Sequence, residues 1–405
     1  MNKNLLFSFL LTACASEYEI KGERPDVNPG DVTECSFSPV SGTKISSYDC
    51  NPVFSGGEEG AGSVAFHSTE VLGHPFYQIW YTDENGALNY AASADGTNWD
   101  DNPQNPALPL DTSASAWDRD SLAGQVVVWD PVENQYIMTY QGINYGDPNS
   151  ESDNEVGIGV ATSPDGLTWT RHPNNPVIDF NQYRLTENEY TGILFGGSVP
   201  AGKEISPSWP LTITVDNRGN LRGYVGASAT SDLVDYFNSA EYQQWTFDSL
   251  FNPNLPPPPF NQQINIYSMN GFSAGEWVLN TGQPVLAGGE SYDLFGMTSA
   301  AVVEYNDVQY MFYVGFAAWE EVEDQSGFIV ARKKSLNLAT STDGGNTWVK
   351  DPNNPIPINT TSALEVSDVG AQVVGSRILL WVTDNYDGKQ AVGYFYYEPD
   401  TDPNE

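Results

Sequence analysis

The chain has 405 residues, with 53 acidic and 16 basic side chains and a formal net charge of −37 at pH 7. A polyanion of this size repels phosphate backbones and anionic lipid head groups, which excludes nucleic acid as a partner and basic-patch binding to membranes. The 11 Trp, 22 Tyr and 18 Phe are spread over the chain in short apolar runs. Because chains that fail to fold are poor in aromatic residues, this composition excludes disorder and predicts a sizeable core.

The first fourteen residues follow the pattern of a bacterial secretion signal. Lys3 precedes an apolar segment, residues 5–11, that is too short to span a bilayer, and small residues come before Cys14. Residues 11–14 resemble the lipobox of bacterial lipoproteins, which implies cleavage before Cys14 and acylation of its sulfur and new amino group. We therefore expect residues 1–13 to be a signal peptide and Cys14 to anchor the protein to the bacterial cell envelope, in the outer membrane. An ordinary secretory signal is the alternative.

The remaining cysteines predict one disulfide bond. Lipidation of Cys14 leaves Cys35 and Cys50 as a pair in an oxidising compartment, and we predict that they are bridged. A metal site on this pair is disfavoured, since neither cysteine has another Cys or His at ligand spacing. Residues 14–34 are polar without an apolar period and predict a tether, and residues 399–405 predict an acidic tail.

Two short phrases recur along the chain. A Ser-x-Asp-Gly turn followed by Trp occupies residues 93–99, 163–169 and 341–348, and an Asn-Pro or Gln-Pro phrase begins at residues 51, 105, 175, 283 and 354. Runs of alternating apolar residues precede each turn, and each unit predicts a meander of antiparallel strands. Five such units predict an all-β chain, a five-bladed β-propeller of four-stranded antiparallel blades over residues 35–398.

The predicted blades are residues 57–104, 105–174, 175–282, 283–353 and 354–398. The third is irregular, because Asp232 and Tyr236 replace the turn phrase and residues 255–259 predict a polyproline-like insertion. Its strands are expected at residues 211–215, 221–227 and 242–247. The fifth lacks an outer strand, and we expect residues between Cys35 and Cys50 to supply it, which closes the ring and removes an exposed edge.

These repeats resemble a known group of enzymes. The turn phrase, the Asn-Pro phrase and the stretch from Ala116-Trp117-Asp118 to Trp129-Asp130 are similar to those of the five-bladed propellers of glycoside hydrolase families 43, 32, 62 and 130. Residues 341–348 also resemble the Asp-box of sialidases, where the Asp and Trp serve the turn itself. The resemblance covers residues 50–398 and implies a carbohydrate ligand or substrate, although a fold alone does not assign an activity.

In such propellers, the segments that precede the inner strands line a funnel at one end of the ring. Here these are residues 55–63, 107–124, 178–198, 287–299 and 359–370. They carry ten carboxylates, which are Glu58, Glu59, Asp118, Asp120, Glu187, Glu189, Glu290, Asp293, Glu365 and Asp368. Glycan hydrolysis needs an acid and a base or nucleophile, together with aromatic platforms for the sugar faces, so this composition is typical of a sugar site.

The resemblance implies an Asp base, an Asp that tunes the acid and a Glu acid from the first three blades. The chain offers Glu58 or Glu59 in the first blade, Asp118 or Asp120 in the second, and Glu187, Glu189 or Glu204 in the third. Because the first blade lacks the expected Asp, no catalytic role is carried over. The candidates for catalysis are Glu59, Asp120 and Asp293. The candidates for substrate binding are Trp117, Asp118, Arg119, Tyr292 and Asp368. A solvated charge is the alternative for each acid.

The other motifs in the sequence give little evidence for a function. Residues 271–275 match a nucleophile elbow, but that site needs a later His, and all three histidines precede it. The acidic run 147–155 offers oxygen ligands for calcium without EF-hand spacing, so a solvated loop is favoured and no other metal or cofactor is expected. His67 in the first inner strand is either a core histidine or a ligand to a central ion or water.

Two function classes remain. One is an envelope-anchored glycoside hydrolase or phosphorylase-like enzyme for neutral oligosaccharides, which the acidic and aromatic funnel favours. The other is a catalytically inactive propeller that binds a glycan or a protein, which the missing Asp favours. We expect a monomer in either case.

Overall fold

The computed structural model describes residues 35–55, 64–71, 74–113, 116–146, 155–215, 220–249, 252, 263–271, 277–324, 327–358, 366–386 and 389–399. The signal peptide, Cys14, the tether, Glu58, Glu59, Glu365, residues 147–154 and residues 400–405 lie outside them. The chain divides into two compact units, Met1–Ser36 and Phe37–Glu405, and the second contains all the described helices and strands. Cys35 and Cys50 are both disulfide-bonded, as the cysteine count predicts. Among the described residues, no helix is long and apolar enough to cross a membrane.

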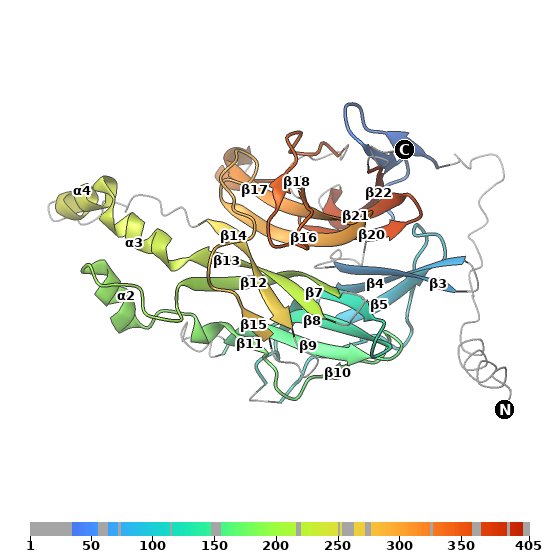
Figure 1. The fold of residues 1–405 in the computed structure, drawn as a ribbon, viewed down its shortest axis with the longest axis horizontal. Helices are drawn as coiled ribbons and strands as arrows, with labels where there is room; N and C mark the ends of the chain where they lie inside the picture. Colours follow the sequence, from blue (N-terminus) through green and yellow to red (C-terminus); the bar gives the residue numbers. More distant parts are fainter. Residues whose placement is uncertain are drawn as a thin grey trace. The chain divides into compact units, whose positions relative to one another are not determined.

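Strands dominate the second unit and run as antiparallel meanders (Figure 1). The first sheet has the order β3 (Val64–Val71), β4 (His74–Thr82), β5 (Leu88–Ser93) and β6 (Asp100–Asp101). The second has the order β7 (Ser121–Asp130), β8 (Gln135–Asn144), β9 (Glu155–Ser163) and β10 (Thr170–Arg171), with β11 (Ile178–Asp179) also paired to β9.

Eight strands are assigned to a third sheet, which consists of two meanders. One contains β12 (Ile205–Val215), β13 (Leu221–Ala229), β14 (Ile264–Gly271) and β15 (Trp277–Leu279). The other contains β16 (Gly296–Tyr305), β17 (Val308–Asp324), β18 (Gly327–Ser341) and β19 (Val349–Lys350). A single parallel pairing, Ile264 with Gly296, joins them.

The last sheet joins residues from far apart in the chain. It has the order β1 (Phe37–Pro39), β2 (Ile45–Tyr48), β22 (Lys389–Tyr397), β21 (Arg377–Tyr386) and β20 (Asp368–Val374). In the pairing of β2 with β22, Ile45 lies opposite Tyr397, and the Ile45 side chain is buried. The prediction that residues between Cys35 and Cys50 supply the outer strand of this meander is confirmed.

The first strands of the five meanders contact one another in a closed cycle. β3 lies beside β7, β7 beside β12, β12 beside β16, β16 beside β20, and β20 beside β3. An apolar core fills the space between each neighbouring pair of meanders. Between the last and the first, for example, the rings of Phe66 and Trp381 stack with centroids 4.9 Å apart. The described chain is therefore a mostly β structure of curled sheets whose first strands surround a common centre.

The recurrent turn has the structural role predicted for it. In the first copy, one carboxylate oxygen of Asp95 accepts hydrogen bonds from the backbone N–H groups of Thr97 and Asn98, both at 2.8 Å. Burial alone would raise the pKa of Asp95, but these hydrogen bonds outweigh it and lower the pKa to about 2. Asp165 and Asp343 bind their own turns in the same way.

The asparagine side chain of each Asn-Pro phrase hydrogen-bonds to the backbone of a strand, in place of a neighbouring strand. The side chain of Asn105 accepts a hydrogen bond from the Tyr90 N–H at 2.8 Å and donates one to the Tyr90 carbonyl at 3.1 Å. It thereby satisfies both backbone groups of a residue in the third strand of its meander. The equivalent pairs are Asn175 with Val160, Asn354 with Leu338, and Asn51 with Tyr394.

The third meander departs from prediction. Residues 242–247 lie in a helix rather than a strand, and β14 supplies the third strand instead. Three α-helices flank β12 and β13, which are α2 (Glu187–Leu194), α3 (Thr230–Asn238) and α4 (Ala240–Ser249), and a short 3-10 helix, η2 (Phe180–Gln182), comes before them. The aromatic residues that imitate a strand pattern pack between helices, as where the rings of Phe237 and Tyr242 approach to 5.1 Å.

Candidate functional site

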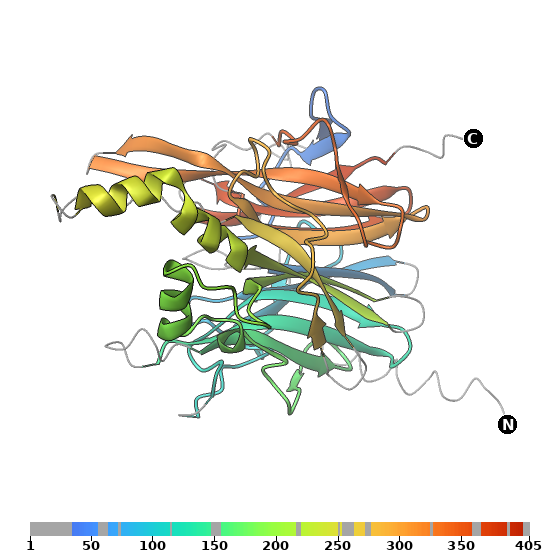
Figure 2. The ribbon, with the colours of Figure 1, turned by 60° about the vertical axis from the view of Figure 1, so that its left-hand side comes forward.

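The mouth is the end of the ring where the first strands of the meanders begin. Ile205, the first residue of β12, pairs with Ala229, the last residue of β13, so α3 begins at this end. Gly296, the first residue of β16, pairs with Phe316, and β17 continues beyond it to Asp324. The helices and the far end of the β17–β18 hairpin therefore extend past the mouth, and both lie at the left of Figure 2.

Asp118, a predicted ligand contact, is buried. Its side chain is 2% exposed and forms an ion pair with Arg171, with Nε 2.8 Å from Oδ2. The Tyr140 hydroxyl donates a second hydrogen bond to the same oxygen at 3.1 Å. Trp117 stacks on Tyr140 with ring centroids 5.8 Å apart. The buried charge of Asp118 needs these partners to offset its desolvation, and the prediction that Trp117 and Asp118 contact a ligand stays a prediction.

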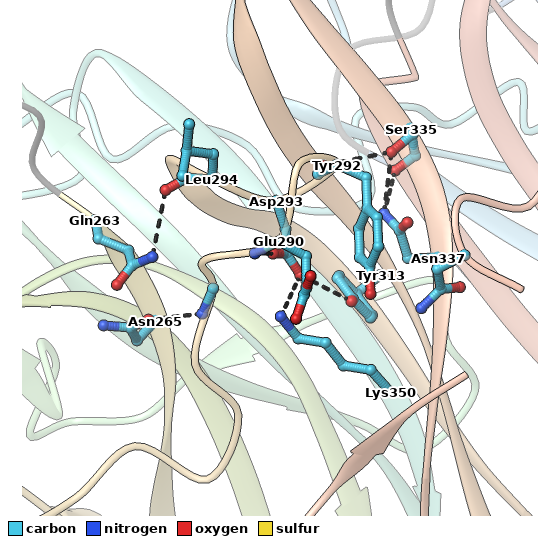
Figure 3. A network of polar contacts seen from close by, with 12 residues as sticks. Gln263, Asn265, Glu290, Tyr292, Asp293, Leu294, Tyr313, Ser335, Asn337 and Lys350 are labelled. Carbon is cyan, nitrogen blue, oxygen red and sulfur yellow. Dashed lines mark hydrogen bonds and ion pairs between the residues drawn. The ribbon is translucent and has the colours of Figure 1, made fainter. Parts of the chain in front are cut away.

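Asp293 is buried in the same manner. Figure 3 shows its polar contacts, and its prediction as a catalytic residue stays a prediction. Lys350 Nζ lies 2.7 Å from its Oδ2, and the Tyr313 hydroxyl donates to that oxygen at 3.0 Å. The other oxygen accepts the backbone N–H of Glu290 at 2.9 Å. Burial, followed by the negative charge of Asp293, raises the pKa of Tyr313 far above its usual range, which keeps the hydroxyl a donor.

Tyr292 precedes this aspartate and belongs to the same network. The Lys350 ammonium lies 5.7 Å from the centre of its ring. Its carbonyl accepts a hydrogen bond from Ser335 Oγ at 3.5 Å. The ring is partly buried. A structural contact with Lys350 therefore accounts for Tyr292, and its prediction as a substrate contact stays a prediction.

Asp120 and Arg119 lie at the surface just before β7. Their side chains are 29% and 32% exposed, and Arg119 Nε donates to Asp120 Oδ1 at 3.2 Å. The other carboxylate oxygen accepts the backbone N–H of Tyr145 at 2.8 Å, and Tyr145 is 57% exposed. Asp120 thus combines a place at the mouth with access to solvent, as do the exposed Glu187 and Glu290.

Asp368 begins β20 and ties three strands together. Its Oδ2 accepts the backbone N–H of Val64 at 2.8 Å, and its Oδ1 accepts hydrogen bonds from Ser299 Oγ and from the Val369 N–H. It lines a small central cavity of about 70 Å³ bounded by all five first strands. Among the described residues it is the single acid lining that cavity, and Gln125 lines it as well.

The third-meander glutamates have local structural roles. Glu189 caps α2 through Thr186 and lies 2.6 Å from Lys203 Nζ, and the hydrogen bond from Lys203 is the main cause that lowers its pKa to about 2. Glu204, directly before β12, accepts the Gly202 N–H at 3.0 Å. Glu187 lies in the first turn of α2. Among the described residues, none of these three glutamates contacts a second carboxylate.

Sequence reasoning missed the aromatic surface of the helices at the mouth. Tyr190, Phe195 and Phe247 are 43%, 83% and 57% exposed. The Tyr190 ring contacts that of Phe237 at 5.5 Å, so α2 and α3 share this surface. A signal is present at residues 242–247, where aromatic residues stand between polar ones, but this pattern predicts a strand there.

Metal binding finds no support in the described part of the chain, where no group of three or more His, Cys, Asp or Glu side chains is close enough to hold an ion. The predicted calcium run, residues 147–155, lies outside the described residues except for Glu155. Glu59 also lies outside them, so its place at the mouth stays a prediction.

Comparison with known proteins gives the fold alone. No family model matches the sequence, and no curated protein does. A solved thermostable family-43 glycoside hydrolase is 16% identical, with a TM-score of 0.50 over 86% of this chain and 90% of that chain. A structure from work on family-130 mannoside phosphorylases and hydrolases is 14% identical, with a TM-score of 0.52 over 93% and 98%. A third, described as a glycoside hydrolase, is 11% identical, with a TM-score of 0.51 over 86% and 92%. The chain therefore resembles the propeller enzymes of glycoside hydrolase families 43 and 130 in fold.

Proposed function

We propose that the chain is a five-bladed β-propeller that binds a neutral glycan at its mouth. The closed cycle of five first strands supports five blades, and β2 supports closure of the last blade by the N-terminal segment. The fold shared with glycoside hydrolases supports a carbohydrate as the ligand class. At their low identities these structures do not transfer a particular substrate.

The observation that carries the proposal is the half-exposed pair of Asp120 and Arg119 at the mouth. A carboxylate and a guanidinium side by side offer acceptors and donors in a fixed plane, as sugar hydroxyls require. The exposed rings of Tyr145 and Tyr190 belong to segments at the same end and can pack on sugar faces. The ligand is neutral in this proposal, because a chain of net charge −37 repels anionic glycans.

The location of the protein is part of the same proposal. Lys3, the apolar residues 5–11 and Cys14 support export and lipid anchoring to the cell envelope. The disulfide-bonded Cys35 and Cys50 agree with an oxidising compartment. A propeller held at the cell surface meets soluble oligosaccharides and the glycans of neighbouring cells.

Hydrolysis is the second candidate function. It is favoured by the same exposed Asp120, which is chemically able to serve as an acid, a base or a partner of Glu59. It is disfavoured by the loss of Asp118 and Asp293 to buried ion pairs, since catalysis needs two carboxylates facing one glycosidic bond.

One experiment separates the two candidates. The full chain, Asp120→Asn, Glu59→Gln and the exposed control Glu133→Gln are mixed with aryl glycosides and neutral oligosaccharides, including β-1,2-mannobiose. We expect binding without turnover, weakened about tenfold or more in Asp120→Asn and unchanged in the control. Turnover that is abolished in Asp120→Asn or Glu59→Gln establishes a hydrolase instead. If no sugar is bound and none is hydrolysed, both candidate functions are contradicted.

A further inference from the structure

A second, larger cavity of about 570 Å³ lies at the end of the ring opposite the mouth. β3 contributes residues 64–66 to the central cavity and His67 to this one, and β16 contributes residues 300–302 to the central cavity and 302–304 to this one. Because the residues further along each strand lie further from the mouth, the two cavities follow one another along the ring. We name the larger one the distal cavity.

The size and lining of the distal cavity are typical of a small-molecule site. Its volume lies within the range of about 300–1,000 Å³ found for ligand pockets. It is lined by one large aromatic ring and by side chains that include both donors and acceptors, which are Trp129, His67, Asn270, Arg222, Glu304 and Gln309. An indole beside hydrogen-bonding groups of both kinds suits a ligand with an apolar face and many hydroxyls.

Two of these side chains carry buried polar atoms that the protein leaves unsatisfied. Arg222 uses its terminal nitrogens on the Gly344 carbonyl at 2.5 Å and on Asn346 Oδ1 at 3.0 Å. Its Nε is buried and finds no hydrogen-bond partner within the part of the chain that the structure describes. Gln309 Oε1 is buried and unpartnered in the same sense, while its Nε2 makes one long contact of 3.4 Å with Glu304. Both atoms are closed off from a molecule the size of water, so the cavity-facing groups of these residues are the Arg222 terminal nitrogens and Gln309 Nε2.

The charges in the distal cavity balance. Arg222 brings one positive charge and Glu304 one negative charge. Burial lowers the pKa of His67 to about 4, so its imidazole is neutral near pH 7. The His67 ring meets the edge of Tyr136 at 5.3 Å and adds no charge to the cavity. An anionic ligand gains little here and is repelled by the chain as a whole.

We propose that the distal cavity binds a neutral mono- or disaccharide, whose hydroxyls bond to Arg222, Gln309 and Asn270 and whose apolar face lies beside Trp129. This site is separate from the mouth and from the glycan site proposed there. A propeller with a ligand at each end binds two sugars at once, and loss of one site leaves the other.

The test is a calorimetric titration of the full chain with D-mannose, D-galactose, L-arabinose and β-1,2-mannobiose. We expect at least one sugar to bind, with one binding site weakened about tenfold or more in the double variant Gln309→Ala with Asn270→Ala. The control is Gln104→Ala, an exposed amide outside the lining, and it keeps the affinity of the unmodified chain.

Three results overturn the proposal. The first is that no sugar binds, and the second is that binding is the same in the double variant as in the control. The third is that binding is lost in Asp120→Asn but kept in the double variant, which places the sugar at the mouth alone. If the double variant fails to fold, a crystal of the unmodified chain soaked with the four sugars decides: density between Trp129 and Arg222 supports the proposal, and its absence there contradicts it.

Discussion

Asp118 and Asp293 hold equivalent positions in two different meanders. Each follows an aromatic residue just before a first strand, and each accepts a hydrogen bond from a tyrosine of the second strand, Tyr140 or Tyr313. Each also pairs with a cation of the fourth strand, Arg171 or Lys350. The repeat thus includes a buried charge pair that links the start of a meander to its end. These buried pairs therefore stabilise their sheets.

Removal of Arg171 should destabilise the fold strongly. Arg171→Met leaves Asp118 charged and nearly buried with only Tyr140 beside it, and we expect a loss of about 3 kcal/mol or more in the free energy of unfolding. Denaturant unfolding measures it. The control is Arg377→Met, whose partner Glu398 is 55% exposed, and there we expect a change of about 0–1 kcal/mol. Similar losses in both variants would contradict the structural role of the buried pair.

The pH dependence of stability should contain a contribution from His67. Its pKa is about 4 in the folded state and near 6.5 when unfolded, so the unfolded chain binds more protons between these values. Its contribution is therefore lost as the pH falls from about 6.5 to 4. We expect His67→Gln to gain about 2–3 kcal/mol relative to the unmodified chain over that range. Unfolding curves of both at pH 7, 5.5 and 4 measure this, and a difference that is constant with pH would contradict it.

Replacing the asparagine of the Asn-Pro phrase should lower the stability of the fold more than replacing an exposed asparagine next to such a phrase. Asn105→Ala removes both side-chain hydrogen bonds to the Tyr90 backbone, whose residue is 2% exposed. We expect a loss of about 1–3 kcal/mol in the free energy of unfolding, since the Tyr90 N–H is left unsatisfied, while its carbonyl keeps the hydrogen bond from the Asn102 N–H at 2.9 Å. Asn353→Ala is the matched control, because Asn353 is exposed and bonds only within its own turn. Thermal or denaturant unfolding should separate the two.

Two adjacent glycines give a sharp test of packing at the fourth meander. Gly344 and Gly345 both have positive φ, but a Cβ on Gly344 meets nothing within 4 Å, whereas one on Gly345 would lie 2.1 Å from the Tyr224 hydroxyl. We expect Gly344→Ala to lose about 1–2 kcal/mol from backbone strain alone. Gly345→Ala should lose clearly more, because Tyr224 is fully buried and has no room to move. Equal losses would show that this turn does not pack as described.

The repeated phrases predicted most of the fold because each has a local physical cause. The turn aspartate binds its own backbone, and the Asn of the Asn-Pro phrase binds a strand of its own meander, so both recur wherever the meander does. The strand predicted at residues 242–247 is wrong, because alternating aromatic residues suit a strand, whereas here they pack against another helix. That partner is set by tertiary contacts, which a local pattern does not contain.

The site was harder to predict because one residue type serves two roles. An aspartate before a first strand is either a ligand group or a buried anchor, and its partner decides which. For Asp118 the partner lies 53 residues away in the chain. A signal did exist: Arg171 and Lys350 each stand two positions after the tryptophan of the turn phrase, and Asp101 takes this position in the first meander. A cation at that position therefore accompanies the buried pair in both meanders that have one.

Because β2 pairs with β22, the last sheet forms late in the folding of the chain. The segments that complete the last sheet are separated by all the other meanders, so that sheet is finished only after residues 389–397 have emerged. Until then, the edge of β21 and the apolar strip around Ile45 have no partner and are open to another molecule. Variants that weaken β2 should therefore form intermolecular pairs before they lose the ring itself.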